Sequence, residues 1–198
     1  MKKTLIILFI LFAFMATTLS AWSPEDLTKF PPCMEADDWI LNLGVGIHGR
    51  IFNYFGNGYW CIPPLRLSFD RNAALGDKGL PFFFGGLVGY ELWGYKGNYW
   101  NYYYVYHKIP VGFRAGYHFN WGVDKLDTYA VATAGYKISI RTHERYGTEY
   151  YSSSLIDDLF LGFSLGARWF VNKGFGFWAE IGTGTYLFNF DIGLSFKF

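Results

Sequence analysis

Apolar and polar residues alternate along most of the chain after its first forty residues. In Phe190–Phe198, for example, large apolar side chains occupy every second position, and polar or small residues occupy the positions between them. A period of two sends successive side chains to opposite faces of a β-sheet. The same period marks Leu41–His48, Val111–His118 and Leu161–Trp169. Less regular stretches complete a predicted set of eight strands: 61–70, 82–92, 127–140 and 175–182.

The polar face of these strands indicates which kind of barrel they form. Its sixteen positions in the four clearest strands include seven glycines and only four charged residues. Water-facing strand positions of a soluble protein favour Lys, Glu and Thr, because glycine weakens a strand and covers nothing. A narrow lumen instead needs small residues beside a few long ones, and the opposite face of Leu, Val, Ile, Phe, Trp and Tyr suits lipid. The sequence therefore predicts an all-β fold, an eight-stranded antiparallel up-and-down transmembrane β-barrel.

The predicted connections alternate between long and short. The long ones are 50–60, 93–106 and 141–158, and the short ones are 71–80, with its Gly76-Asp77-Lys78-Gly79 turn, 120–124 and 172–174. In barrels of the outer membrane, long loops face outward and short turns face the periplasm. We expect Pro63, Pro64 and Pro110 at the outer ends of their strands, where a missing backbone donor costs least.

Composition narrows the functional classes. The chain has 45 aromatic residues (8 Trp, 16 Tyr and 21 Phe) and only 17% charged residues, which excludes a disordered chain. Lys and Arg number 17 against 16 Asp and Glu, so no basic excess points to nucleic acid. Two cysteines are too few for a disulfide-dense secreted scaffold.

The first residues have the order of a secretory signal peptide. Lys2 and Lys3 precede an apolar run, 5–16, which small residues follow as far as Ala21. The run is shorter than the ~20 residues of a spanning helix. We therefore expect a signal peptide over 1–21, a periplasmic N-terminal segment over 22–38, and the barrel over 39–198.

Two stretches resemble a known family. They are AGYHFNWGVDKLDTYAVATAGY, 115–136, and LGARWFVNKGFGFWAEIGTGTYLFNFDIGLSFKF, 165–198. Both are similar to the small outer-membrane β-barrel proteins of Gram-negative bacteria, known as the porin family or the outer-membrane protein β-barrel domain. Ile62–Ser68 resembles the second strand of that family. The resemblance implies the barrel fold and the outer membrane, but no single activity, because the members differ in role.

The last strand also matches the assembly signal of that family. The signal is a polar residue, a glycine two positions later, and apolar or aromatic residues at the third-last and last positions. Asp191, Gly193, Phe196 and Phe198 occupy those places. The barrel-assembly machinery pairs with the edge of such a strand, whose alternate side chains fill fixed pockets. The alternative is an ordinary amphipathic strand that ends in Phe.

Strand parity sends a set of charged residues into the lumen: Arg66, Glu91, Arg114, Arg168, Glu180, Asp191 and Lys197. Charges of both signs in a narrow, low-dielectric space should pair, because an unpaired buried charge is costly. The tight turn at 172–174 places Arg168 about one diagonal step from Glu180, so we expect these two to pair. The charges could form a structural plug, or a gate along a narrow ion path.

The residues do not indicate catalysis. None of the four histidines, His48, His107, His118 and His143, lies in a His-x-Ser pair, and His107 at the predicted outer rim is the one candidate of interest. No phosphate loop or metal-ligand cluster occurs in the sequence. We expect no enzyme activity, no cofactor and no metal.

The predicted loop 93–106 has eight aromatic residues in fourteen. Its possible ligand-facing members are Trp93, Tyr95, Tyr99, Trp100, Tyr102 and Tyr104. They could stack on sugars or a partner protein, or they could form an extended hairpin whose rings join the interfacial girdle. The predicted loop 141–158 is polar and serine-rich, typical of a solvated surface loop.

The two cysteines leave a disulfide open. Cys33 precedes the first strand on the predicted periplasmic side, and Cys61 begins the second strand at the outer rim. A strand of about ten residues separates them by roughly 30 Å. A bond would need residues 22–38 to pass through the lumen.

These patterns predict an outer-membrane protein without catalysis, with a structural or surface role or limited passage of small solutes. A surface adhesin or ligand-binding protein using residues 93–106 is the alternative, and a lipid-modifying enzyme is a distant one. The expected partners are outer-membrane lipid, the barrel-assembly machinery and an extracellular ligand, but not nucleic acid.

Overall fold

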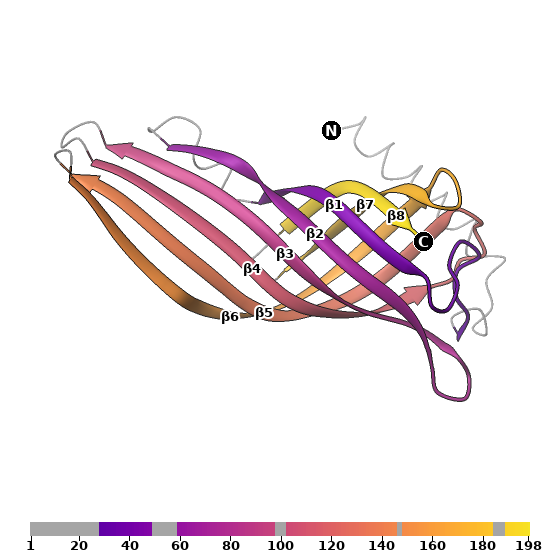
Figure 1. The fold of residues 1–198 in the computed structure, drawn as a ribbon. Helices are drawn as coiled ribbons and strands as arrows, with labels where there is room; N and C mark the ends of the chain where they lie inside the picture. Colours follow the sequence, from indigo (N-terminus) through magenta and orange to yellow (C-terminus); the bar gives the residue numbers. More distant parts are fainter. Residues whose placement is uncertain (1–27, 49–58, 98–101, 146–147, 184–188) are drawn as a thin grey trace, which may run out of the picture.

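A computed structural model describes residues 28–48, 59–97, 102–145, 148–183 and 189–198. Its strands are β1 (Trp39–His48), β2 (Tyr59–Leu75), β3 (Leu80–Gly97), β4 (Tyr102–Phe119), β5 (Leu126–Arg145), β6 (Thr148–Phe170), β7 (Phe175–Thr183) and β8 (Asn189–Lys197). Each strand pairs with its neighbours in sequence, and β1 pairs with β8, so the sheet closes into a barrel (Figure 1). All these pairs are antiparallel. The prediction of an eight-stranded antiparallel barrel is confirmed.

The outer surface of the barrel is apolar on every strand. Phe113 is 83% exposed and Leu161 71%, whereas Arg114, the neighbour of Phe113, is 2% exposed. A continuous belt of this kind is far larger than the apolar patches that soluble monomers expose. With polar groups inside and apolar groups outside, the chain is a transmembrane β-barrel.

The lumen is narrow, and glycines make room for its large rings. A Cβ atom at Gly116 would overlap the Phe83 ring, and one at Gly166 would overlap the Tyr129 ring. Phe83 and Tyr129 meet edge to face, with their ring centroids 5.4 Å apart. The glycine-rich polar face in the sequence is therefore the space that these side chains fill.

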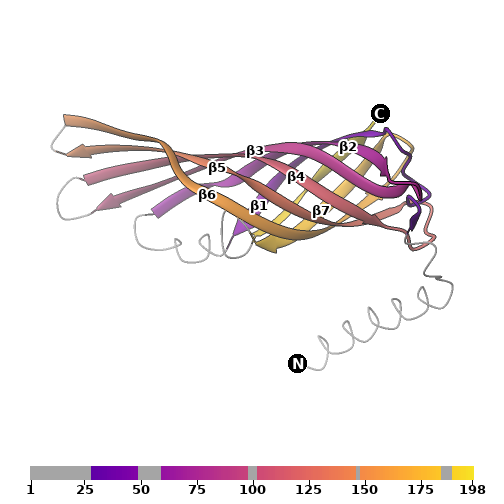
Figure 2. The same cartoon turned by 90° about the horizontal axis from the view of Figure 1, so that it is seen from below.

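The two ends of the barrel differ (Figures 1 and 2). At one end, here called the tight-turn end, short connections lie beside residues 28–38 and the C-terminus. Gly76 and Gly79 have positive φ angles of 70° and 65° in the β2–β3 turn, a conformation that glycine adopts without strain. At the other end, here called the hairpin end, β3, β4, β5 and β6 extend well beyond β7 and β8.

Two predicted loops are largely strand, which corrects the sequence interpretation. In the segment 93–106, β3 continues to Gly97 and β4 begins at Tyr102. In the segment 141–158, β5 continues to Arg145 and β6 begins at Thr148. The antiparallel ladders continue in both hairpins, with Tyr95 opposite Tyr104, because Tyr, Trp, Val and Thr favour strands even where no lipid faces them.

The prolines also lie within strands rather than at their ends. The β2–β3 register shifts between Ile62 and Leu65, at Pro63 and Pro64, as expected where a ladder donor is missing. Pro110 lies inside β4.

Residues 1–27, with the predicted signal peptide, lie outside the described residues, as do 49–58 in the predicted loop 50–60. Within the described part of the chain, no helix is long and apolar enough to cross a bilayer.

Candidate functional site: a sealed lumen and a projecting sheet

A chain of ion pairs crosses the lumen, here called the lumen network. Its members, from the hairpin end to the tight-turn end, are Asp191, Arg66, Glu180, Arg114, Asp70, Arg168, Asp127 and His118. They come from β2, β4, β5, β6, β7 and β8, so the network joins opposite walls of the barrel.

The part of the lumen network nearer the hairpin end centres on Glu180. One carboxylate oxygen of Glu180 lies 2.7 Å from Arg66. The other oxygen accepts hydrogen bonds from Arg114, at 3.0 Å, and from the Tyr129 hydroxyl, at 3.1 Å. Arg66 also contacts Asp191 at 2.5 Å. Three donors thus surround the Glu180 carboxylate, and contacts of this kind stabilise a buried charge.

The part nearer the tight-turn end centres on Arg168, whose side chain is fully buried. Its guanidinium donates to Asp127 at 2.6 Å, to Asp70 at 3.2 Å and to Asn42 at 3.2 Å. It also lies 4.1 Å from the centroid of the Tyr129 ring. The planar fork of arginine suits this set of acceptors around one point.

The expected pair of Arg168 with Glu180 is wrong. Both side chains point into the lumen, but Gly166 stands opposite Glu180 in the β6–β7 register, and Arg168 stands opposite Trp178. Arg168 reaches across to β5 and β2, and Glu180 receives Arg66 and Arg114. A long guanidinium can cross a narrow lumen, so its partner need not be on the next strand.

Sequence reasoning missed Asp70, Asp127 and His118 as members of the network. Asp70 has the same parity as Arg66 on β2, and His118 has the same parity as Arg114 on β4. Parity could therefore have identified both. Asp127 stood at the first position of its predicted strand, where parity is least certain.

The remaining predicted lumen charges lie at the two ends. The Glu91 side chain is buried near the hairpin end, and its Cα pairs in register with Lys108. Lys197 lies at the tight-turn end, where its ammonium donates to the Cys33 carbonyl at 2.9 Å and to Asp38 at 3.1 Å.

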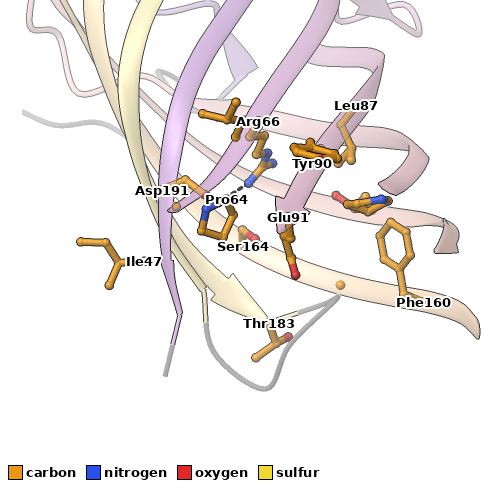
Figure 3. A pocket seen from close by; sticks show the side chains of 16 residues that line it. Ile47, Pro64, Arg66, Leu87, Tyr90, Glu91, Phe160, Ser164, Thr183 and Asp191 are labelled. Atoms are coloured by element: carbon orange, nitrogen blue, oxygen red, sulfur yellow. Dashed lines mark hydrogen bonds and ion pairs between the residues drawn. The ribbon is translucent and has the colours of Figure 1, made fainter. Parts of the chain in front are cut away.

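A small cavity with both apolar and charged lining residues lies next to the lumen network, on its hairpin-end side (Figure 3). All eight strands contribute to its lining, which includes Arg66, Glu91, Ser164, Thr183 and Asp191. Figure 3 shows Arg66 beside Asp191, joined by an ion pair. The cavity volume is about 70 Å³. Because ligand pockets commonly measure ~300–1,000 Å³, this cavity has room for a few water molecules and not for a metabolite.

Beyond this cavity, β3 to β6 form what we call the projecting sheet. The cavity lining includes Ile47 of β1 and Thr183 of β7, which lie at or next to the ends of those strands. It also includes Glu91, Pro110 and Thr133, beyond which β3, β4 and β5 continue for several residues. The inner face of the projecting sheet therefore rises above the low side of the barrel wall.

An aromatic ladder lies on that inner face. Trp93 and Tyr106 are paired in register, and their rings are stacked with centroids 3.8 Å apart. The guanidinium of Arg141 lies 4.7 Å from the Tyr106 ring centroid. The ring centroids of Tyr104 and Tyr106 are 6.4 Å apart, and Tyr95 of β3 is the register partner of Tyr104.

The other predicted aromatic residues and histidines are placed as follows. Tyr99 and Trp100 lie outside the described residues, and Tyr102 is the first residue of β4. His107 receives or donates a 2.8 Å hydrogen bond with the Tyr90 hydroxyl. His118, expected near the periplasmic end, is fully buried at the tight-turn end.

Residues 28–38 close the tight-turn end, and we call them the stopper. Pro31 is fully buried, and Met34 packs in an apolar cluster with Ile40 and Phe170. Asn120 donates to the Phe30 carbonyl at 3.0 Å. Cys33 of the stopper and Cys61 of β2 are both free thiols. Burial, with the nearby Asp127 carboxylate, raises the pKa of Cys33 to about 12.

The residues of the predicted assembly signal lie on or beside the closing strand. Asp191, Gly193 and Phe196 belong to β8, and Phe198 follows it. Phe198 exchanges backbone hydrogen bonds with Trp39 at 2.8 and 3.0 Å, which extends the β1–β8 seam.

No family model matches the chain, and no curated protein matches it. Among solved structures, the chain is similar to a de novo designed transmembrane β-barrel, with 13% identity, a TM-score of 0.46, and coverage of 83% of this chain and 98% of the design. It is also similar to Ail, the attachment invasion locus protein of Yersinia pestis, with 9% identity, a TM-score of 0.43, and coverage of 83% and 100%. The structure of Ail in a phospholipid nanodisc gives 9% identity and a TM-score of 0.38, with coverage of 82% and 99%. These likenesses concern the fold alone, and membership of the porin family stays a prediction.

Proposed function

We propose that this chain is a non-catalytic protein of the outer membrane, in which a sealed barrel anchors the projecting sheet at the cell surface. The lumen network carries the proposal. Its central side chains, Arg114, Asp70, Arg168 and Asp127, have no solvent exposure, and together they join opposite walls.

A sealed lumen favours a surface role over solute passage. A solute would have to separate several buried ion pairs, and leaving one buried charge without its partner costs about 3–5 kcal/mol. The stopper adds a second barrier at the tight-turn end. With the tight-turn end in the periplasm, the projecting sheet faces outward.

Recording in planar lipid bilayers tests the seal. We expect no single-channel steps from folded protein whose incorporation is verified by co-flotation with liposomes. A porin of known conductance serves as the positive control. Regular conductance steps from the wild-type protein would overturn the proposal in favour of a pore.

The aromatic ladder supports a binding role for the projecting sheet. The Tyr106 ring is stacked on Trp93 and lies beneath the Arg141 guanidinium, so the Trp93 ring and this cation are the groups of the stack that a ligand can contact. By strand parity, Lys108 and Lys137 share this surface with Arg141, against Glu91, and Asp158 is the register partner of Lys137. Rings that stack on sugars, combined with excess positive charge, fit an acidic saccharide.

Binding to heparin and to neutral dextran, measured with the protein in nanodiscs, tests this role. We expect heparin to bind and dextran not to bind, and Arg141→Ala to weaken heparin binding about tenfold, the loss of ~1.4 kcal/mol. Lys125→Ala is the matched control, because Lys125 is exposed at the opposite end. Equal losses in the two variants would exclude the ladder as the binding surface.

A further inference from the structure

Both ring nitrogens of His118 face hydrogen-bond acceptors. Nδ1 lies 2.6 Å from a carboxylate oxygen of Asp127, and Nε2 lies 3.0 Å from the amide oxygen of Asn72. The orientation of the Asn72 amide is set by its other contact, because its nitrogen donates to the Glu35 carbonyl at 2.9 Å. Neither partner can donate to the ring, so both ring nitrogens have to donate.

The charges of the lumen network lead to the same protonation state. Without the histidine, three guanidinium groups stand against four carboxylates: Arg66, Arg114 and Arg168 against Asp70, Asp127, Glu180 and Asp191. The network thus lacks one positive charge. An imidazolium at His118 makes it neutral, which is what burial in a low-dielectric lumen favours.

We propose that His118 is an imidazolium in the folded barrel, and that this charge holds the stopper across the tight-turn end. The proposal goes beyond the surface role and does not depend on it. It assigns a conformational task to His118, the member of the lumen network at the tight-turn end.

The stopper rests on the group that His118 orients. The Asn72 side chain accepts a hydrogen bond from Nε2 and donates one to the Glu35 carbonyl. Its backbone N–H donates to the Asp38 carbonyl at 2.9 Å, and its carbonyl accepts from the Asp37 N–H at 3.3 Å. The Phe30 ring lies 5.7 Å from the His118 ring. If Nε2 lost its proton, two acceptors would face each other. Turning the Asn72 amide would only move the conflict to the Glu35 carbonyl.

The groups around His118 support the charge. Asp127 of β5 gives one oxygen to His118 and the other to Arg168 of β6, so the two cations share one carboxylate. Tyr129 of β5 and Phe83 of β3 present rings at 6.4 and 4.9 Å. At the same end of the barrel, Lys197 pairs with Asp38 of the stopper at 3.1 Å, and Arg71 pairs with Asp37 at 2.7 Å.

Nitrogen-15 spectra of the protein in micelles, labelled at histidine, test the protonation state directly. We expect both ring nitrogens of His118 to carry protons at about pH 7.5, where a solvent-exposed histidine is mostly neutral. His118→Gln assigns the signals by removing one set. A His118 ring with one unprotonated nitrogen under these conditions would overturn the proposal.

The link to the stopper is tested by alkylation of Cys33 in a Cys61→Ser background. We expect His118→Gln to raise the labelling rate at least ~10-fold, because opening of the stopper exposes the thiol. His107→Gln, which changes a histidine outside the lumen network, is the matched control and should leave the rate unchanged. Unchanged labelling in a folded His118→Gln barrel would show that the charge does not hold the stopper. If His118→Gln does not fold, the labelling of Cys33 in Asn72→Ala decides the question: a raised rate supports the link through Asn72, and an unchanged rate overturns it.

Discussion

Arg168 links more of the lumen than any other side chain described above. It contacts Asp127 and Asp70 and lies over the Tyr129 ring. Its removal would leave two buried carboxylates with less positive charge around them. The effect should therefore fall on stability and on the seal together.

We expect Arg168→Ala to lower the free energy of unfolding by about 3–5 kcal/mol, the cost of leaving a buried charge without its partner. Urea denaturation in detergent, followed by tryptophan fluorescence, measures the change. Trp169→Phe should have little effect, because Trp169 is the next residue and faces lipid. Equal destabilisation by both changes would contradict the network.

Double variants identify the partner of Arg168. Arg168→Ala combined with Asp127→Asn should recover part of the lost stability, because the change also removes the carboxylate that binds Arg168 at 2.6 Å. Arg168→Ala combined with Glu180→Gln should show no recovery. If stability recovered only when Arg168→Ala was combined with Glu180→Gln, Glu180 would be the partner of Arg168, as the sequence predicted.

Cys33 should react slowly while the barrel is folded. Its pKa is raised to about 12 from a usual value of 9.0, mainly by burial, and the thiolate is the reactive form. In the Cys61→Ser background we expect maleimide labelling to be at least ~10-fold slower in the folded protein than in urea at about pH 8. Equal rates would mean that the stopper does not cover the thiol.

The same shift sets the sign of a pH effect on stability. The folded-state pKa of Cys33 lies above its unfolded value. Its contribution to the free energy of unfolding is therefore fully present below about pH 9 and is lost as the pH rises towards 12. Cys33→Ser should remove this part of the alkaline loss of stability.

At the scale of elements, the period of two was sufficient to predict eight strands, because each strand has one face towards lipid and one towards the lumen. It could not locate the ends of β3 to β6. Beyond the cavity neither face of the projecting sheet is expected to meet lipid. Aromatic residues such as Tyr95 of β3 and Tyr104 of β4 therefore have neighbours that are not consistently polar, and the period of two that marks a strand is lost.

The sequence predicted which side chains point into the lumen better than it predicted which of them form ion pairs. Parity sends Arg66, Arg168 and Glu180 inward, but their side chains are long enough to reach several strands. The choice of partner depends on barrel tilt and on the space left by glycines such as Gly166, which the sequence does not encode locally.

The β1–β8 seam is the element whose loss should prevent assembly. We expect Phe198→Ser to reduce the amount of folded barrel in the outer membrane without reducing export. The Phe198 ring lies outside the barrel, 6.2 Å from the Phe69 ring, next to the backbone pair with Trp39. Heat-modifiable mobility on gels measures the folded fraction.

Phe198→Tyr is the control for this seam, because it keeps the ring. A wild-type amount of folded Phe198→Ser protein would exclude both the assembly signal and the ring contact.

At the scale of the whole molecule, the tip of the β3–β4 hairpin in the projecting sheet should not be needed for folding of the barrel. We expect replacement of residues 95–104 by Asn-Gly to leave the barrel folded, with a change of no more than about 1 kcal/mol in stability. Gly94 and Val105 are paired in register, so a two-residue turn can join them. Loss of heat-modifiable mobility would show that the tip of this hairpin is needed for folding.

The shortest strands set how much of this protein lipid can surround. Nine residues are described in each of β7 and β8, and at ~3.3 Å per residue and a tilt of about 45° this stretch rises roughly 21 Å. The apolar band of typical outer-membrane barrels is ~25 Å tall. A bilayer much thicker than this would have to thin around β7 and β8, so hydrophobic mismatch should make the barrel fold more readily in lipids with short acyl chains than in those with long ones.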